Sequence, residues 1–389
     1  MIAALRWRTP LGWRQLSAKK LRLAVAVVGV MFANVLMFMQ FGFLKALIGT
    51  SIMIQSSFVG DIVISSATGR QLQGIGTIPR RRLMQALAVQ GVADVTEVYN
   101  GSIEWINPST GKSAQLSVLG IDPQARVFDN ADIERQRGAL LLPDAALLDR
   151  RSRGAWQAIV AEVERDGIFR TEIAGRQATI DGLFSMGAGF ASDGTLIVSR
   201  ETFLNFARAR TAGAASFGIV SIEPGYDAAD VAAHIRAALG ESDAKVETMA
   251  EFIAGHRRFL AKDSPISFVF TVGALVGLVV GAGIVYQILA SDVNEHLAEY
   301  ATLKALGYSH GHLLSVVFEQ SAILAILGYV PSVLAAQLLY TAVNRATSLP
   351  IALDMDRLLL VFALTFGMCL VSGALATLRL RAADPADVF

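Results

Sequence analysis

Four long runs of apolar residues constrain the fold of this chain more than any other feature of its sequence. Residues 264–291 contain no charged side chain, and residues 23–44 contain none either. A helix of roughly 20 residues rises about 1.5 Å per residue and therefore crosses the roughly 30 Å hydrocarbon core of a bilayer. Residues 313–343 and 358–378 are similarly apolar. The sequence therefore predicts four membrane-spanning helices, the first of them over residues 23–49.

The composition agrees with a chain that is only partly in water. Charged residues make up 17% of the chain and hydrophobic residues 53%, whereas a soluble domain carries about 25% charged residues. The net charge of +1 gives no electrostatic reason to expect a nucleic-acid partner. Cys369 is the single cysteine and lies in an apolar run, so neither an intrachain disulfide nor a cysteine metal cluster is expected.

The N-terminal segment, residues 1–22, carries six basic residues and no acidic one. It is either an interfacial amphipathic helix or a basic flank that only fixes orientation. A cleaved signal peptide competes with a first span over residues 23–49. The apolar run is too long for a signal peptide, and no small-x-small cleavage site follows it. We therefore expect an uncleaved span with the N-terminus in the cytoplasm.

Residues 50–263 differ from the rest, because charges return and short strand-like runs alternate with helical ones. Residues 79–89, 227–239 and 248–263 are predicted to be helical. A long domain crosses a membrane largely regardless of its charge, so we expect an α+β domain in the periplasm. The runs predicted to be strands are residues 61–65, 114–119, 178–184, 195–199 and 216–222.

The predicted fold class is thus an α-helical membrane protein with four transmembrane helices and a large α+β periplasmic domain inserted between the first and second helices. An even number of spans returns the C-terminus to the cytoplasm, in agreement with Arg379 and Arg381 after the last run. The connecting segments are expected to be a cytoplasmic loop over residues 292–312, a short periplasmic loop over residues 344–357 and a cytoplasmic tail over residues 379–389.

The cytoplasmic loop combines charge with a short helical pattern. Leu297 and Tyr300 share one face of the predicted helix with Leu303 nearby, and Gly307 can end the helix. A short helix joined rigidly to two spans could transmit force from a docked partner. From the residues alone, this interpretation and that of a simple loop helix are equally well supported.

Three glycines in the second run recur at every fourth position: Gly273, Gly277 and Gly281. Glycines at this spacing lie on one helix face and allow a neighbouring helix to approach closely, although glycine is common in membrane helices in any case. Glu319 in the third run is either a buried functional carboxylate or, as we favour, a carboxylate near the interface that reaches water.

Motifs that would indicate catalysis are absent from the sequence. There is no GxxxxGK[ST] phosphate-binding loop, no HExxH and no GxSxG. His296, His310 and His312 fall in the cytoplasmic loop and are better explained as solvated side chains than as metal ligands. Four spans are also few for a self-contained secondary transporter. We expect a non-catalytic membrane subunit without a metal or cofactor of its own.

Five segments of the chain form a specific combination of motifs: residues 32–43 (FANVLMFMQFGF), 182–199 (GLFSMGAGFASDGTLIVS), 285–297 (VYQILASDVNEHL), 300–325 (YATLKALGYSHGHLLSVVFEQSAILA) and 383–389 (ADPADVF). Together they resemble the membrane subunit of DevC-type ABC exporters, within the broader MacB/FtsX-like permease group. Residues 150–154 do not fit the family pattern closely.

The resemblance implies the permease half of a tripartite efflux system in the inner membrane, embedded in membrane lipid and paired as a homodimer. A separate DevA-type ATP-binding subunit, which holds the ATP and Mg²⁺, would dock on the loop. A DevB-like membrane-fusion protein and a TolC-like channel would complete the system, and the cargo would be lipid-like or otherwise amphiphilic. The residues expected to couple the loop to the ATPase are Glu299, Tyr300, Leu303, Lys304, Gly307 and Tyr308.

Two other activities of the same broad group remain open. An FtsX-like signalling or scaffold subunit would use the same motion to activate an envelope hydrolase and would move no cargo. A lipoprotein-releasing permease would act on lipoproteins. The resemblance to the DevC-type subunits favours the exporter.

Overall fold

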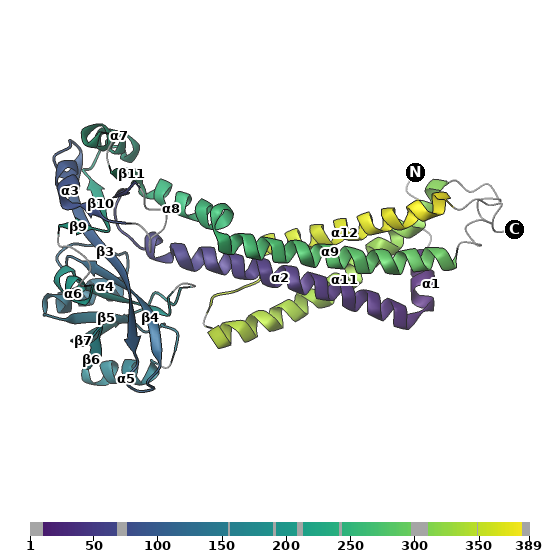
Figure 1. Cartoon of the computed structure of the whole chain (residues 1–389), viewed down its shortest axis with the longest axis horizontal. Coiled ribbons are helices and arrows are strands. Elements are labelled where there is room, and N and C mark those ends of the chain that lie inside the picture. The colour runs from purple at the N-terminus through teal and green to yellow at the C-terminus, as the bar shows by residue number, and fades with distance from the viewer. Residues whose placement is uncertain are drawn as a thin grey trace. The chain divides into compact units, whose positions relative to one another are not determined.

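The computed structural model describes residues 11–67, 76–154, 156–189, 192–207, 213–240, 243–296, 310–347 and 349–382. The chain forms two compact units, which Figure 1 shows as a group of long helices and a sheet. The helical unit contains residues 1–45, 265–346 and 351–389, and the sheet unit contains residues 46–264 and 347–350. In chain order, the sheet lies between the first and second long helices.

The helical unit is built from long apolar helices. These are α2 (Lys20–Ser56, up to Lys45), α9 (Pro265–Glu295), α11 (His310–Thr347) and α12 (Met355–Ala382), preceded by the short α1 (Leu11–Ala18). By length and composition, four helices in the described part of the chain could cross a membrane. The prediction of four apolar helices is therefore confirmed.

The long helices extend beyond the apolar runs from which they were predicted. The first span was expected over residues 23–49, and α2 covers Lys20–Ser56; α11 and α12 likewise exceed residues 313–343 and 358–378. Hydropathy marks only the apolar stretch, whereas a helix continues until its backbone hydrogen bonding stops. Pro331 lies inside α11.

The sheet unit contains a nine-stranded mixed sheet with the strand order β11-β1-β10-β3-β4-β8-β5-β7-β6, and a two-stranded sheet of β2 and β9. The pairs β4–β8 and β5–β7 are parallel, and the other pairs are antiparallel. The strands are β1 (Ile62–Ser66), β2 (Ile78–Pro79), β3 (Val92–Ile106), β4 (Ser113–Ile121), β5 (Ala145–Asp149), β6 (Phe169–Ile173), β7 (Arg176–Phe184), β8 (Gly194–Ser199), β9 (Ala214–Ala215), β10 (Phe217–Ile222) and β11 (Ala244–Thr248).

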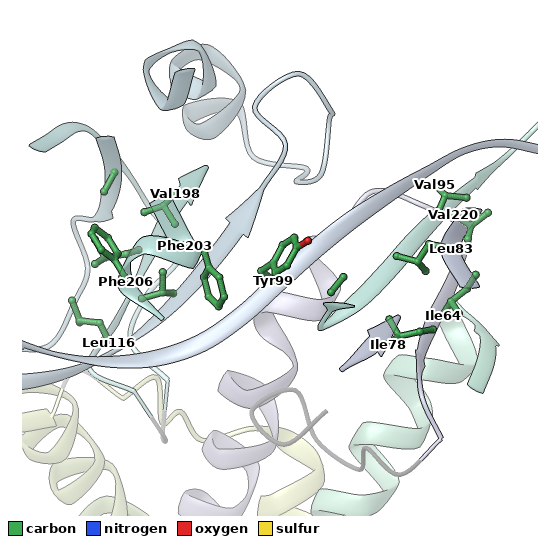
Figure 2. Packing of buried hydrophobic residues seen from close by; sticks show 14 of the residues in the cluster. Ile64, Ile78, Leu83, Val95, Tyr99, Leu116, Val198, Phe203, Phe206 and Val220 are labelled. Atoms are coloured by element: carbon green, nitrogen blue, oxygen red, sulfur yellow. The ribbon is translucent and has the colours of Figure 1, made fainter. Parts of the chain in front are cut away.

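Two apolar clusters cover the two faces of the large sheet, because successive side chains of a strand point to opposite faces. On β8, Leu196 and Val198 belong to one cluster and Ile197 to the other. On β1, Ile62 and Ile64 likewise separate from Val63. Figure 2 shows part of the first cluster. Burial on both faces explains why these strands appear in the sequence as continuous apolar runs.

Short helices cover the sheet, and most begin at a residue whose side chain accepts backbone hydrogen bonds. Asn130, Ser199, Asp227 and Thr248 cap α4, α6, α7 and α8 in this way. The short helices are α3 (Arg80–Leu87), α4 (Ala131–Gln136), α5 (Gln157–Asp166), α6 (Arg200–Phe206), α7 (Ala228–Leu239) and α8 (Met249–Arg258).

The segment expected as one helix over residues 248–263 has two parts. After α8, a π-helical turn covers Phe259–Asp263, and Ser264 is extended with ψ 131°. Proline disfavours helical geometry at the residue before it and is itself well tolerated at the first helical position. Pro265 accordingly begins α9 as a new helix.

Burial of His256 predicts a pH-dependent stability of the sheet unit. His256 lies in α8, and burial lowers the pKa of its imidazole below the ordinary value. As the pH falls below about 6.5, the unfolded chain binds protons that the folded chain excludes. Stability that is present above about pH 6.5 should therefore be lost as the pH falls toward the folded-state pKa. Denaturant unfolding of the wild type and of His256→Gln between pH 8 and pH 5 would measure this; an unchanged pH profile in the variant would contradict it.

Candidate functional site

The candidate site consists of the helix ends that flank residues 297–309. The residues predicted to couple to an ATPase (Glu299, Tyr300, Leu303, Lys304, Gly307 and Tyr308) lie outside the described residues. The last turn of α9 and the first half of α11 are described, together with α1 and the start of α2. Their contacts define what a force applied to the loop would act on.

A charged cluster joins the start of α2 to the end of α9. Arg22 donates two hydrogen bonds to Glu295, from Nη1 to Oε2 over 2.9 Å and from Nη2 to Oε1 over 2.7 Å. Nζ of Lys19 lies 2.5 Å from Oε2 of Glu295. A single exposed ion pair contributes only about 0.2–1 kcal/mol. A bidentate arginine has a more specific geometry, so this cluster fixes the position of one helix end against the other.

One turn deeper, a buried polar pair joins α9 to α11. Nε2 of Gln320 donates to Oδ2 of Asp292 over 2.8 Å, and both side chains are almost fully buried. Nδ1 of His296 lies 3.0 Å from the carbonyl oxygen of Asp292. A buried carboxylate requires hydrogen-bonded partners, so this pair should be costly to break. It ties together the two helices that enter and leave the loop.

The short helix α1 packs against the same region. A Cβ atom built on Gly12 would lie 3.1 Å from Oε1 of Glu319 and from Cγ of Gln320. Leu16 is buried in the apolar cluster of the helical unit. Oε1 of Glu319 is buried and has no hydrogen-bond partner among the described residues. Within the N-terminal segment, the described residues 11–18 thus form a helix that contacts α11.

The three glycines of α9 face α2. A Cβ atom built on Gly273 would lie 2.5 Å from Nε2 of Gln40, one on Gly277 would lie 3.1 Å from a methyl group of Leu36, and one on Gly281 would lie 2.7 Å from Cβ of Ala33. No side chain fits at Gly281 without a shift of its neighbours. Small residues that allow helix backbones to approach closely are typical of membrane helix interfaces.

Sequence reasoning missed other close contacts between helices, because one glycine gives no periodic signal. A Cβ atom on Gly29 would lie 2.6 Å from Ile284 of α9, one on Gly42 would lie 2.5 Å from the Tyr340 hydroxyl of α11, and one on Gly328 would lie 2.4 Å from Val30 of α2.

A second charged cluster, which the sequence also did not reveal, surrounds Arg357 at the start of α12. Its Nη1 donates to the Tyr340 hydroxyl over 3.1 Å and to the Ala352 carbonyl over 2.9 Å. Its Nε lies 3.5 Å from Asp354, which also pairs with Lys45 of α2. The Arg357 side chain is only 6% exposed. These contacts join Lys45 of α2, Tyr340 of α11 and the start of α12.

In the sheet unit, Arg153 binds the residue that ends α11. Its Nε donates to the carbonyl oxygen of Thr347 over 2.8 Å, and its Nη2 donates to that of Gly189 over 2.9 Å. Its Nη1 lies 3.4 Å from Oδ1 of Asp193. Residues 347–350, between α11 and α12 in the chain, belong to the sheet unit. Arg153 thus connects this segment to the chain between β7 and β8.

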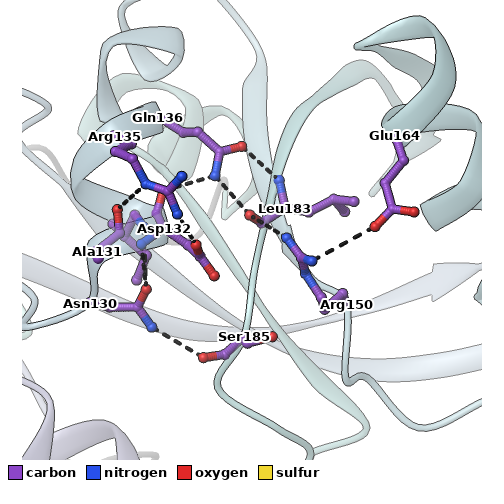
Figure 3. Close-up of polar contacts among 10 residues, drawn as sticks. Asn130, Ala131, Asp132, Arg135, Gln136, Arg150, Glu164, Leu183 and Ser185 are labelled. Carbon is purple, nitrogen blue, oxygen red and sulfur yellow. Dashed lines mark hydrogen bonds and ion pairs between the residues drawn. The ribbon is translucent and has the colours of Figure 1, made fainter.

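The chain between β7 and β8 is itself fixed by polar contacts. Buried Asp149 accepts hydrogen bonds from the backbone N–H groups of Met186 (3.2 Å) and Gly187 (2.5 Å). Burial raises the pKa of Asp149 above its ordinary value, although these N–H groups favour the ionised form. Figure 3 shows the neighbouring contacts, in which Asn130 binds the Ser185 carbonyl (3.1 Å) and Gln136 binds both backbone groups of Leu183.

The described residues contain no group of three or more His, Cys, Asp or Glu side chains that could hold a metal ion. His296 lies beside Asp292, and the side chain of His310 lies outside the described residues. The described contacts of the candidate site are ion pairs and hydrogen bonds that connect one helix to another.

Comparison with known families assigns the C-terminal part of the chain. Residues 271–385, which include most of α9 and all of α11, match the model described as FtsX-like permease C-terminal. This part of the chain is therefore similar to the C-terminal part of FtsX-like permeases. No curated protein matches the sequence.

Solved structures that resemble the chain include two domains of transport proteins. The periplasmic region of MacB from Actinobacillus actinomycetemcomitans is 15% identical with a TM-score of 0.34, over 51% of this chain and 92% of that one. The extracellular domain of the ABC-type transporter YknZ from Gram-positive bacteria is 11% identical with a TM-score of 0.34, over 48% of this chain and 98% of that one. At these scores neither likeness assigns a function.

Replacement of Gly281 tests the packing of α9 against α2 and α12. Gly281→Leu should lower the free energy of unfolding of the helical unit by roughly 1–3 kcal/mol, because the added side chain overlaps Ala33 and Met368. Gly283→Leu is a matched control, since a Cβ atom there meets no atom within 4 Å. Thermal unfolding in detergent would compare the two variants, and equal melting temperatures would contradict the prediction.

Proposed function

We propose that this chain is the inner-membrane permease subunit of an ABC export system, in which a separate ATPase drives motion of the helices and of the sheet unit. The observation that carries the proposal is the FtsX-like permease match over residues 271–385, in a chain whose sheet unit precedes the matched part. The four apolar helices support a multi-pass membrane protein.

In this proposal the ATPase binds residues 292–312 from the cytoplasm, through Glu299, Tyr300, Leu303, Lys304, Gly307 and Tyr308. ATP and Mg²⁺ belong to that partner. The ties around the loop favour this role, because Asp292 binds Gln320 of α11, and Glu295 binds Arg22 of α2. A displacement of the loop would therefore move three helices together instead of bending one helix end.

The sheet unit is proposed to lie in the periplasm, with both termini of the chain in the cytoplasm. The basic residues before α2 support this orientation. The resemblance to DevC-type subunits supports a homodimer that works with a DevA-type ATPase, a DevB-like membrane-fusion protein and a TolC-like channel. A lipid-like or otherwise amphiphilic cargo would suit that system.

Purification of the native complex in mild detergent tests the proposal. Co-elution of an ATP-binding subunit and a membrane-fusion protein is the expected result. An ATPase with a cell-wall hydrolase and no fusion protein would favour an FtsX-like signalling subunit, and retention of lipoproteins in a deletion strain would favour a lipoprotein-releasing permease. Absence of any ATPase would contradict the proposal.

A double substitution in the loop tests the coupling. Leu303→Asp combined with Gly307→Asp should abolish stimulation of the partner ATPase, since it places charge on the apolar face predicted from the sequence and removes the glycine predicted to end the loop helix. Membrane insertion should be unchanged. Insertion and ATPase activity of the reconstituted complex are the two measurements, and normal stimulation by the double variant would exclude a coupling role for these residues.

Loss of Arg153 should separate ATP hydrolysis from transport. Arg153→Gln removes the contacts with Thr347 and Gly189, through which motion of α11 would reach the sheet unit. We expect normal ATPase stimulation with at least several-fold slower export. Arg150→Gln is the matched control, because the contacts of the Arg150 side chain within the described ranges are weak: 3.5 Å to the Leu183 carbonyl and 3.7 Å to Glu164 (Figure 3). Equal export by both variants would exclude this role of Arg153.

A further inference from the structure

The long strand β3 is shared between two half-sheets. Its residues 92–98 pair with β10, and the last pair in that register joins Val98 to Phe217. Its residues 99–106 pair with β4, beginning with Tyr99 opposite Gly120. We name β11, β1, β10 and residues 92–98 the first half-sheet, and residues 99–106 with β4, β8, β5, β7 and β6 the second half-sheet. The neighbour of β3 thus changes between Val98 and Tyr99.

The side chains around this point follow the same division. In Figure 2, Val95, Val220, Leu83, Ile64 and Ile78 lie on one side of Tyr99, and Phe203, Phe206, Val198 and Leu116 lie on the other. The Tyr99 ring packs against Phe203 of α6, with ring centroids 5.7 Å apart. Tyr99 is therefore the side chain at which the two parts of the apolar cluster meet.

Three charged side chains, those of Arg80, Glu97 and Arg200, lie close together beside Val98–Tyr99. Nε of Arg80 donates to Oε1 of Glu97 over 2.5 Å, and Nη1 of Arg200 lies 3.9 Å from Oε2 of Glu97. The Tyr99 hydroxyl donates to Oε2 over 3.0 Å. The Glu97 side chain is only 11% exposed, so its charge is poorly hydrated and depends on these partners.

The two arginines come from opposite sides of the joint. Arg80 begins α3, whose Leu83 side chain lies against Gly218 of β10 in the first half-sheet. Arg200 begins α6, whose Phe203 side chain lies against Gly120 of β4 in the second half-sheet. Glu97 thus links a helix of one half-sheet to a helix of the other.

The positions of these arginines are unfavourable for the helices themselves. A positive charge in the first turn of a helix opposes the helix dipole. Both Arg80 and Arg200 nevertheless occupy the first helical residue. A residue that breaks a local rule in this way points to a role outside its own helix. Arg80 donates to Glu97 over 2.5 Å. Arg200 lies 3.9 Å from Glu97 and also donates two hydrogen bonds to Glu201, over 2.7 and 3.0 Å.

The space beside the charges is open. A cavity of about 290 Å³ is lined by residues of both half-sheets and their helices, among them Arg80, Met84, Asp94, Asp122 and Arg200. An interior of close-packed side chains resists rotation of its parts. A water-accessible, polar cavity at the joint permits rotation without compression of the apolar cluster.

Tyr99 keeps its proton under all ordinary conditions. Burial, together with the charge of Glu97, raises the pKa of Tyr99 to about 12. The hydroxyl therefore stays a hydrogen-bond donor to Glu97 and does not become a second negative charge beside it.

We propose that Glu97, Arg80 and Arg200 form a charged clasp that sets the angle between the two half-sheets, which bend relative to each other at Val98–Tyr99. The clasp holds one angle while its contacts are intact, and its loss releases a range of angles. In the exporter proposed above, this bending would be the movement available to the sheet unit. The clasp itself requires neither a partner nor a cargo.

Distance measurements on the full chain test the clasp. Cys369→Ala removes the native cysteine, and Ala237→Cys on α7 with Ala161→Cys on α5 places one spin label on each half; both alanines are exposed. Double electron–electron resonance should give one narrow distance distribution for this protein in detergent. Glu97→Gln should broaden the distribution or shift its maximum by several ångströms.

Two further variants keep the result decisive. Glu104→Gln is a matched change on the same strand, at an exposed carboxylate, and should leave the distribution unchanged. Arg200→Gln alters a partly exposed side chain and should reproduce the broadening even if Glu97→Gln fails to fold. A wild-type distribution in Arg200→Gln, or equal broadening in Glu104→Gln, would overturn the proposal.

Discussion

The hydrocarbon interior of a bilayer cannot hydrogen-bond a peptide group, and the helical unit depends on this constraint. Every spanning segment must satisfy its backbone hydrogen bonds internally, so the spans are helices. In lipid, the hydrophobic effect does little to drive one helix to bind another. The interactions that hold the helices together are therefore close contacts at glycines such as Gly281 and a few internal hydrogen bonds. Examples are the 2.7 Å contact of Thr365 with Asn34 and the 2.8 Å bond from Ser372 to the Ala282 carbonyl. Charged side chains such as Arg22, Glu295 and Arg357 lie near the ends of the apolar stretches. In the proposed exporter, motion of the partner ATPase would reach the helices at one of these ends.

The same constraint explains what the sequence could predict. Long apolar runs are diagnostic, so the four helices were predicted correctly, and α2 and α11 differ only in their ends. Contacts between helices were largely hidden. Arg357 binds Tyr340, and Lys45 pairs with Asp354, but no spacing in the sequence links such partners. The predicted coupling residues lie outside the described part of the chain and stay a prediction.

In the sheet unit, the five predicted strands were found because each is buried or alternates clearly in polarity. β3 was missed, although it is the longest strand. Its Asp94, Glu97 and Glu104 interrupt the apolar pattern, and Asn100 with Gly101 suggests a turn. The features that hid β3 are those that give it a separate role, since Glu97 is the carboxylate that both half-sheets share. A failure of local sequence rules here marks a joint and not an irregular loop.

In the proposed exporter, a displacement of residues 292–312 would reach the sheet unit along connections in the chain and through side chains that bind them. Three such connections lie in the described part of the chain: α2 passes through Lys45 into the sheet unit, Pro265 leads from it into α9, and residues 347–350 belong to it between α11 and α12. Arg153 binds the last of these at Thr347. A rigid sheet would convert three such inputs into one rotation. A sheet that bends at Val98–Tyr99 would instead convert differences among them into a change of the angle between its two half-sheets.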